Sequence, residues 1–69
     1  MKQSAFLKSS VIVSAVYSDW RLLINFTNGH SICYYDVPWN VYDRLVHAQS
    51  PGKYYNDVIR SHYRSERQL

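Results

Sequence analysis

The first half of the chain alternates apolar and polar side chains with the two-residue period of β-strands. Residues 10–17 read Ser-Val-Ile-Val-Ser-Ala-Val-Tyr, and such β-branched residues favour strands. Both faces of this first predicted strand are apolar, so the pattern leaves its inward face open. After a turn at Ser18-Asp19, residues 20–26 form a second predicted strand. Its core-facing side chains are expected to be Leu22, Ile24 and Phe26, with Leu23 and Asn25 on the opposite face.

A glycine-containing hairpin, Thr27-Asn28-Gly29, joins the second predicted strand to a third. A two-residue turn at Asn28-Gly29 would pair Ile24 with Cys33. A three-residue loop with Gly29 in the left-handed conformation pairs Ile24 with Ile32 instead, and it collects the apolar residues on one face. Because the hydrophobic pattern normally fixes strand register, we predict the three-residue loop and a third strand over residues 30–36. The resulting core face carries Leu22, Ile24, Phe26, Ile32 and Tyr34.

The apolar spacing then changes to that of helices. Pro38 opens a predicted helix over residues 38–48, since proline is tolerated in the first helical turn. Ser50-Pro51 repeats the start signal, with Ser50 as N-cap and Pro51 at the first helical position, and predicts a second helix that ends near Tyr63. The apolar stripe of the first helix consists of Val41, Tyr42, Leu45 and Val46.

Strands grouped before helices indicate an α+β fold. We predict a three-stranded antiparallel β-meander followed by two α-helices packed on one face of the sheet, with a core over residues 9–63. Residues 1–8 and 64–69 are polar and are expected to fray. The uncovered face of the sheet should carry Leu23, Asn25, Ser31, Cys33 and Tyr35.

Composition supports one folded domain. Hydrophobic residues make up 46% and aromatic residues 16% of the 69-residue chain, enough for a rich core in so small a protein. The single cysteine, Cys33, excludes an intrachain disulfide and hence a disulfide-stapled secreted scaffold. The chain has neither the ~7–15-residue apolar run of a signal peptide nor the ~18 apolar residues of a membrane helix. We therefore expect a cytoplasmic protein with no membrane partner.

Short motifs along residues 9–63 form a recognisable series. They are Ser9-Ser10 with Ile12, Asn28-Gly29, Tyr34, Val37-Pro38, Ala48, Ser50, Gly52, Tyr54-Tyr55-Asn56, Ile59-Arg60 and Tyr63. The series resembles the KTSC domain, which is named for its place at the C-terminus of some lysyl-tRNA synthetases and also occurs free-standing in bacteria and phages. The chain is thus similar to a single free-standing KTSC domain over residues 1–69, and the resemblance implies RNA, more than DNA, as a partner.

Two positions depart from the family pattern. Ile32 stands where the family has the first tyrosine of a Tyr-x-Tyr pair, and Tyr55 stands where phenylalanine is usual. Because the predicted register turns Ile32 toward the helices, we expect this position to serve packing rather than recognition.

The side chains that could carry catalysis are scattered. Cys33 lies in the middle of a predicted strand, where cysteine usually acts as a small hydrophobe. His30, His47 and His62 fall on three different elements, so no pair has the spacing of a metal site on one helix. We expect a binding domain that is not an enzyme and has no catalytic residue, metal or cofactor.

A basic stripe is the first candidate binding site. The formal net charge is +3, and Lys53, Arg60 and Arg64 are spaced seven and four residues apart, which would place them on one face of the second helix. Arg67 follows them. Basic groups bind phosphates and aromatic rings stack on unpaired bases, so this stripe favours nucleic acid. The alternative is a solvated helix surface with an ion pair between Asp57 and Arg60.

The open sheet face is the second candidate. Leu23, Cys33 and Tyr35, with Val11 or Val13, would leave an apolar patch of the kind that marks partner sites. The partner would be a second copy in a homodimer or another protein, as for a phage or bacterial regulatory or inhibitor protein. The alternative is that the N-terminal segment folds over this face and covers it with Phe6 and Leu7.

Overall fold

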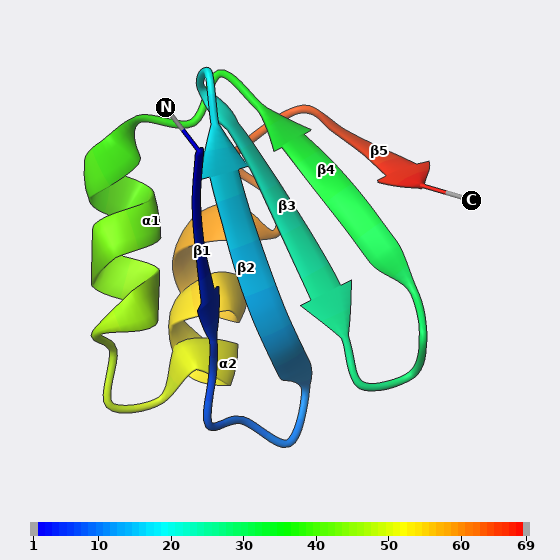
Figure 1. The fold of residues 1–69 in the computed structure, drawn as a ribbon, viewed down its shortest axis with the longest axis vertical. Coiled ribbons are helices and arrows are strands. Elements are labelled where there is room, and N and C mark those ends of the chain that lie inside the picture. Colours follow the sequence, from blue (N-terminus) through cyan, green and yellow to red (C-terminus); the bar gives the residue numbers. More distant parts are fainter. Residues whose placement is uncertain (1, 69) are drawn as a thin grey trace.

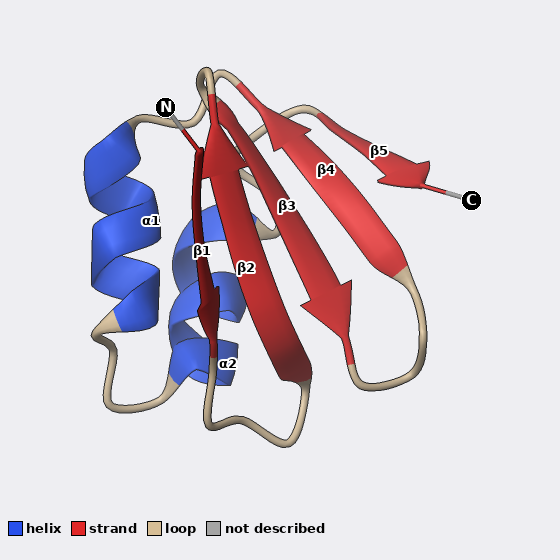
Figure 2. Ribbon diagram, viewed as in Figure 1, coloured by secondary structure: helices blue, strands red, loops and turns tan. Residues whose placement is uncertain are grey.

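Within residues 2–68, five antiparallel strands form one sheet in sequence order, and the helices lie on one side of it (Figure 1). The computed structural model describes residues 2–68. Its strands are β1 (Lys2–Phe6), β2 (Ile12–Ser18), β3 (Arg21–Phe26), β4 (Ser31–Tyr35) and β5 (Ser65–Gln68). Between β4 and β5 come α1 (Trp39–Val46), α2 (Pro51–Tyr54) and a π-helical turn, η1 (Tyr55–Ile59). Figure 2 shows the helical segments together behind the sheet, which leaves its front face open.

The central hairpin has the predicted register. Ile24 pairs with Ile32 and Leu22 pairs with Tyr34 across β3 and β4. The loop holds three residues: the Phe26 N–H donates to the His30 carbonyl at 2.9 Å, and Gly29 adopts a φ of 89°. This confirms the choice that the apolar pattern dictated. Leu22, Ile24 and Tyr34 are buried, and Phe26 and Ile32 pack against them.

A β-bulge decides the inward face of β2, which the sequence left open. The register shifts between Ile12, opposite Phe26, and Ser14, opposite Asn25, so Val13 is an extra residue. A bulge reverses the alternation of faces. Ile12, Ala15 and Tyr17 therefore all point inward and are buried.

Segments near both chain ends form strands, β1 and β5, so the prediction that residues 1–8 and 64–69 fray is wrong for the described part of these ranges, and the predicted three-stranded sheet has five strands within residues 2–68. Residues 1 and 69 lie outside the described residues. Ala5 pairs with Ala15 in β2, and Glu66 pairs with Cys33 in β4. An edge strand packs against one neighbour only and is often polar, because charged edges resist aggregation. Such a strand has the same composition as a frayed terminus, and this explains the error.

The turn between β2 and β3 lies one residue later than predicted. Ser18 pairs with Arg21, so the turn residues are Asp19 and Trp20. Both have positive φ, 51° and 65°, as in the tight turns that match strand twist. Glycine or asparagine is usual at such positions, and for that reason Trp20 looked like the first residue of a strand.

The first helix is as predicted, but the second is not. In α1, Val41, Tyr42 and Leu45 are buried. The second helix begins with Pro51 in its first turn, yet its α-helical part ends at Tyr54. It continues as η1, in which the Arg60 N–H donates to the Tyr55 carbonyl at 2.9 Å, and the chain then turns into β5. The predicted helix to Tyr63 is therefore too long by about one turn.

Buried tyrosines connect the sheet to the helical layer. The Tyr17 hydroxyl donates to the Val37 carbonyl at 2.8 Å. The hydroxyls of Tyr34 and Tyr55 hydrogen-bond to each other, and burial, followed by this bond, raises the pKa of Tyr34 well above its usual range. Within residues 2–68 no helix has the length and apolarity needed to cross a bilayer.

Candidate functional site

A groove of about 750 Å³ lies where the α2–η1 segment meets the β3–β4 hairpin and β5. It is formed by segments far apart in the sequence, because η1 packs beside the hairpin and β5 returns along β4. Its lining residues are Val11, Phe26, Asn28, His30, Ile32, Gly52, Tyr55, Asn56, Arg60 and Arg67.

The floor of the groove is apolar and aromatic. Phe26 and Tyr55 pack edge to face, with ring centroids 5.3 Å apart and an interplanar angle of 71°. Ile32 is partly buried beside them and packs on the core. Because Tyr55 also hydrogen-bonds to the buried Tyr34 and belongs to the core cluster, this floor is continuous with the core.

The rim of the groove carries the basic groups. Arg60 follows directly after η1, and its Nη1 donates to Asn56 Oδ1 at 3.1 Å. Arg67 lies opposite Ile32 in the β4–β5 ladder, so its side chain belongs to the helix-facing side of the sheet. His30 adds an imidazole from the hairpin. The ten lining residues include no carboxylate, which favours an anionic ligand.

The predicted stripe of Lys53, Arg60 and Arg64 does not form one surface. Lys53 Nζ lies 2.6 Å from Asp57 Oδ2, and both groups are outside the groove. The hydrogen bond between them raises the pKa of Lys53 and lowers that of Asp57. Asp57 therefore pairs with Lys53. The solvated-surface alternative had paired it with Arg60 instead.

Arg64 lies on the other side of the molecule. Its guanidinium carbon is 5.1 Å from the centre of the Tyr35 ring, on the open sheet face. The seven-and-four spacing assumed an α-helix through Tyr63, whereas η1 has a wider turn and the helix ends at Ile59. The structure thus places Arg60 and Arg67 on one groove and adds His30, which the sequence suggested only as an isolated candidate for catalysis or metal binding.

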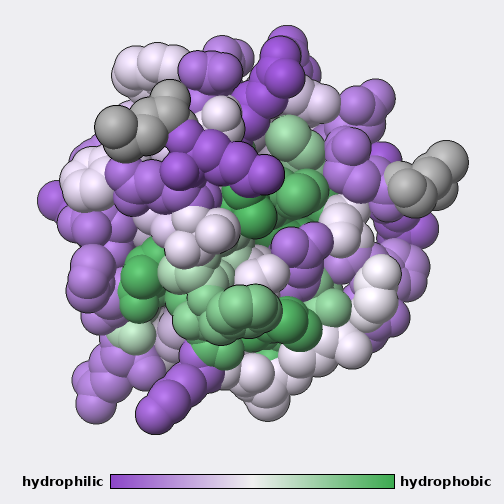
Figure 3. Space-filling view, viewed as in Figure 1, coloured by the Kyte–Doolittle hydropathy of each residue, from purple (hydrophilic) through white to green (hydrophobic). Residues whose placement is uncertain are grey.

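The open face of the sheet has an apolar centre and a charged corner. In the central row, Leu23 pairs with Val16 of β2 and with Cys33 of β4. Figure 3 shows this face, with apolar surface in the middle and polar surface around it. Leu23 and Cys33, both predicted for a partner interface, lie in this row and are half-buried.

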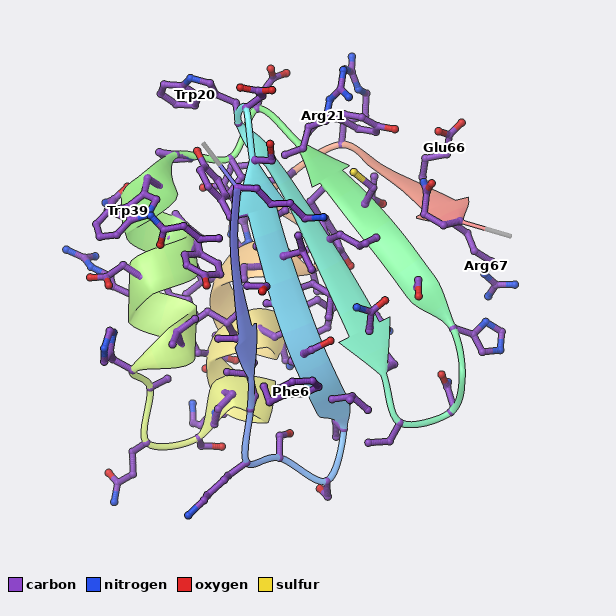
Figure 4. The ribbon with its side chains drawn as sticks, in the orientation of Figure 1. Phe6, Trp20, Arg21, Trp39, Glu66 and Arg67 are labelled. Atoms are coloured by element: carbon purple, nitrogen blue, oxygen red, sulfur yellow. The ribbon has the colours of Figure 1, made fainter. Side chains whose placement is uncertain are left out.

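Tyr35, the third predicted interface residue, belongs to the charged corner. Its hydroxyl donates to Glu66 Oε1 at 3.0 Å, and Arg21 and Arg64 lie beside its ring. The hydrogen bond to Glu66 is the main reason that the pKa of Tyr35 is raised. Figure 4 shows Arg21 and Glu66 at the same end of the sheet.

The N-terminal segment does not cover the open face. It pairs along the edge of β2, with Leu7 turned toward the core, while Phe6 remains 88% exposed. Of the valines considered for the patch, Val11 lines the groove and Val13 sits at the bulge. The alternative in which Phe6 and Leu7 cover this face is therefore wrong, and Phe6 adds an exposed ring to this side of the sheet (Figure 4).

The side chains considered for catalysis stay apart. Cys33 lies in mid-strand between Leu23 and Glu66. His30 lies in the hairpin, His47 follows α1 and His62 follows η1. Among residues 2–68, no three His, Cys, Asp or Glu side chains gather in a group that could hold a metal ion.

Comparisons with known proteins agree with the fold. The family model of the KTSC domain matches residues 8–63. A protein from Tsukamurella paurometabola is 34% identical over 61 residues, covering 86% of this chain and 91% of that protein. The crystal structure of a KTSC domain protein from Yersinia pestis superposes with a TM-score of 0.92 at 24% identity and covers 100% of both chains. The likeness of fold therefore extends to both terminal strands.

Proposed function

We propose that this chain, which belongs to the KTSC domain family, is a non-enzymatic domain that binds single-stranded nucleic acid, RNA in preference to DNA. The residues that match the family model include Arg60 and the whole groove floor. The observation that carries the proposal is the convergence of Arg60 and Arg67 on one groove with an aromatic floor and no carboxylate in its lining. Arginine suits phosphate, because its planar fork donates two parallel hydrogen bonds.

The size of the groove favours an unpaired nucleotide. Its volume of about 750 Å³ lies within the ~300–1,000 Å³ of typical small-molecule sites. One base can pack against Phe26 and Ile32 while its phosphates meet the arginines on the rim. A base in a duplex must be unpaired and unstacked before it can enter the groove, and this costs free energy. Single strands should therefore bind more tightly than duplexes.

The chemistry of the groove supports binding over catalysis. Tyr55 carries the one hydroxyl side chain among its lining residues, and this hydroxyl is hydrogen-bonded to Tyr34. A nucleophile or general base needs a free, activated group within hydrogen-bond reach of the substrate. The groove offers guanidinium and amide groups, which suit positioning and charge neutralisation, and the imidazole of His30, which has no carboxylate beside it among the lining residues to orient it as a general base.

Fluorescence anisotropy with labelled single-stranded RNA, double-stranded RNA and single-stranded DNA tests the proposal. We expect micromolar binding to single-stranded RNA that weakens steeply with salt and falls at least fivefold in Arg60→Ala. Lys53→Ala is the matched control, because it removes the same charge from outside the groove. Equal losses in both variants, or no preference among the three nucleic acids, would contradict a specific site in the groove.

The open sheet face supports a second candidate, a homodimeric interaction module. The observation in its favour is the apolar row of Val16, Leu23 and Cys33 together with the 88% exposed Phe6. Exposed apolar patches of this kind mark protein contacts. Sedimentation analysis should then show a dimer that resists salt and dissociates in Leu23→Asp. A monomer at all concentrations would remove this candidate and leave the groove.

A further inference from the structure

The hairpin between β3 and β4 places His30 at the groove. The His30 backbone N–H donates to Asn28 Oδ1 at 3.0 Å, and its carbonyl accepts from the Phe26 N–H at 2.9 Å. These hydrogen bonds close the three-residue loop in which Gly29 has a φ of 89°. The backbone of His30 is thus tied on both sides, and its exposed side chain is one of the lining groups of the groove.

The charged groups that line the groove together with His30 are cations. Arg60 comes from the position directly after η1, and Arg67 comes from β5. The remaining titratable side chain of the lining is Tyr55, and a tyrosine hydroxyl is ordinarily neutral below about pH 9. The lining residues therefore supply no negative charge that would stabilise a protonated imidazole.

The acidic side chains of the neighbouring elements are engaged elsewhere. Asp57 of η1 pairs with Lys53 outside the groove. Glu66 of β5 accepts a hydrogen bond from Tyr35 on the open sheet face. The other aspartates, Asp19, Asp36 and Asp43, do not line the groove either. Within the part of the chain that the structure describes, a negative charge at the groove must therefore come from a bound ligand.

A bound phosphate changes the balance between the neutral and the charged imidazole. Histidine is the side chain that ordinarily gains or loses its charge between about pH 5 and pH 8. An opposite charge nearby favours the protonated form, so phosphate and proton bind together by linkage. The added affinity is present at low pH, where the imidazole is charged, and it is lost as the pH rises through the range in which a histidine releases its proton.

We propose that His30 is the third phosphate-binding side chain of the groove, beside Arg60 and Arg67, and that it binds as an imidazolium, so that binding of single-stranded RNA takes up a proton. This inference rests on the proposed binding of single-stranded nucleic acid. His30 makes the affinity of the groove depend on pH near neutrality. The two arginines cannot do this, because a guanidinium stays charged throughout this range.

The test is the binding of a labelled uridine heptamer to the full chain, measured by fluorescence anisotropy at about pH 5.8 and about pH 7.5, on either side of the usual titration of histidine. The heptamer carries no terminal phosphate, so its own charge is the same at both values. We expect about five- to tenfold tighter binding at the lower pH. The slope of log K against log salt should be steeper there by about 0.7, the value for one phosphate contact of a single strand.

Two substitutions of the exposed His30 separate its charge from its other properties. His30→Gln keeps a neutral hydrogen-bonding side chain and should bind at both pH values as the wild type does at the higher one. His30→Arg keeps the charge and should bind at both values as the wild type does at the lower one. His47→Gln is the matched control, because His47 lies beside Asp43 and outside the groove, and it should keep the wild-type pH dependence.

The outcomes separate this inference from the proposed function. Equal wild-type affinity at both pH values, or a pH dependence that persists in His30→Gln, overturns the role of His30 and leaves nucleic-acid binding standing. A pH dependence that is lost equally in His47→Gln shows a response to overall charge and overturns it as well. Absence of wild-type binding at both pH values and low salt overturns both proposals.

Discussion

The two faces of the sheet differ in how their residues come together. The open face is built from adjacent strands, and each of its rows follows from local pairing, as in the row of Val16, Leu23 and Cys33. The groove on the other side is formed by a hairpin, the end of a helix and strand β5. Arg60 and Arg67 both line it, although β5 follows the helical segment in the sequence.

The core and the candidate binding groove lie on the same side of the sheet. The helix-facing side contains the fully buried core residues and, at its margin, the basic groove. The open face contains half-buried apolar side chains and a charged corner around Tyr35. The groove proposed as the binding site thus lies beside the core, and substitutions on the two faces should have separable effects.

The largest expected difference concerns the neighbouring residues Leu22 and Leu23, which point to opposite faces. Leu22 is fully buried, so Leu22→Ala should lower the free energy of unfolding by about 2–5 kcal/mol. Leu23 is half-buried, so Leu23→Ala should cost only about 1 kcal/mol, because less area is lost and no cavity remains. Urea denaturation at two protein concentrations measures both. A concentration-dependent loss for Leu23→Ala as large as that for Leu22→Ala would show that a second copy covers the open face.

The next comparison uses two tyrosines. Tyr55→Phe leaves the hydroxyl of Tyr34, a residue 2% exposed, without its partner, which should cost about 1–3 kcal/mol of unfolding free energy. Tyr35→Phe removes an exposed hydrogen bond to Glu66 and should change stability by no more than about 0.5 kcal/mol. Thermal and urea denaturation measure both variants. The double variant Tyr34→Phe with Tyr55→Phe should recover most of the loss, and an additive double variant would contradict a coupled pair.

The sequence predicts the open face and the central core well, because both depend on patterns that can be read within one strand, one hairpin or one helix. The two-residue period and the Gly29 loop are sufficient to place Ile24 opposite Ile32 and to turn Leu23 and Cys33 outward. The stripe of α1 follows in the same way from helical spacing. The bulge at Val13 has no such signature, since both faces of β2 are apolar.

The groove is harder to predict, because it depends on where the second helix stops. An α-helix extended to Tyr63 would place Lys53 and Arg64 on one face. The π-helical turn and the end of the helix at Ile59 place them apart. Predicting Arg67 at the groove requires knowing that residues 65–68 pair with β4, and their polar composition equally suits a frayed end. Arg60 lines the groove, but the residues that line it together with Arg60 are brought there by tertiary packing.

A smaller effect is expected for a matched pair of arginines in the binding assay. Arg67 lines the groove and Arg64 lies by Tyr35 on the open face. Arg67→Ala should weaken single-stranded RNA binding by about five- to tenfold and reduce the slope of log K against log salt by about 0.7, the value for one phosphate contact. Arg64→Ala should stay within about twofold of the wild type. Equal effects would mean that RNA follows the general positive charge and not the groove.

The smallest effect concerns the ion pair between Lys53 and Asp57, which lies outside the groove. The hydrogen bond from Lys53 lowers the pKa of Asp57 from its ordinary value of 3.8, so the pair stabilises the fold above that pH and its contribution is lost as the pH falls through the lowered pKa. Both side chains are exposed, so solvent screening keeps the effect small. An NMR titration of the Asp57 carboxyl should give a lower midpoint in the wild type than in Lys53→Ala. Equal midpoints would mean that Lys53 is free in solution, and Lys53→Ala should then weaken RNA binding as Arg67→Ala does, which would extend the basic surface beyond the groove.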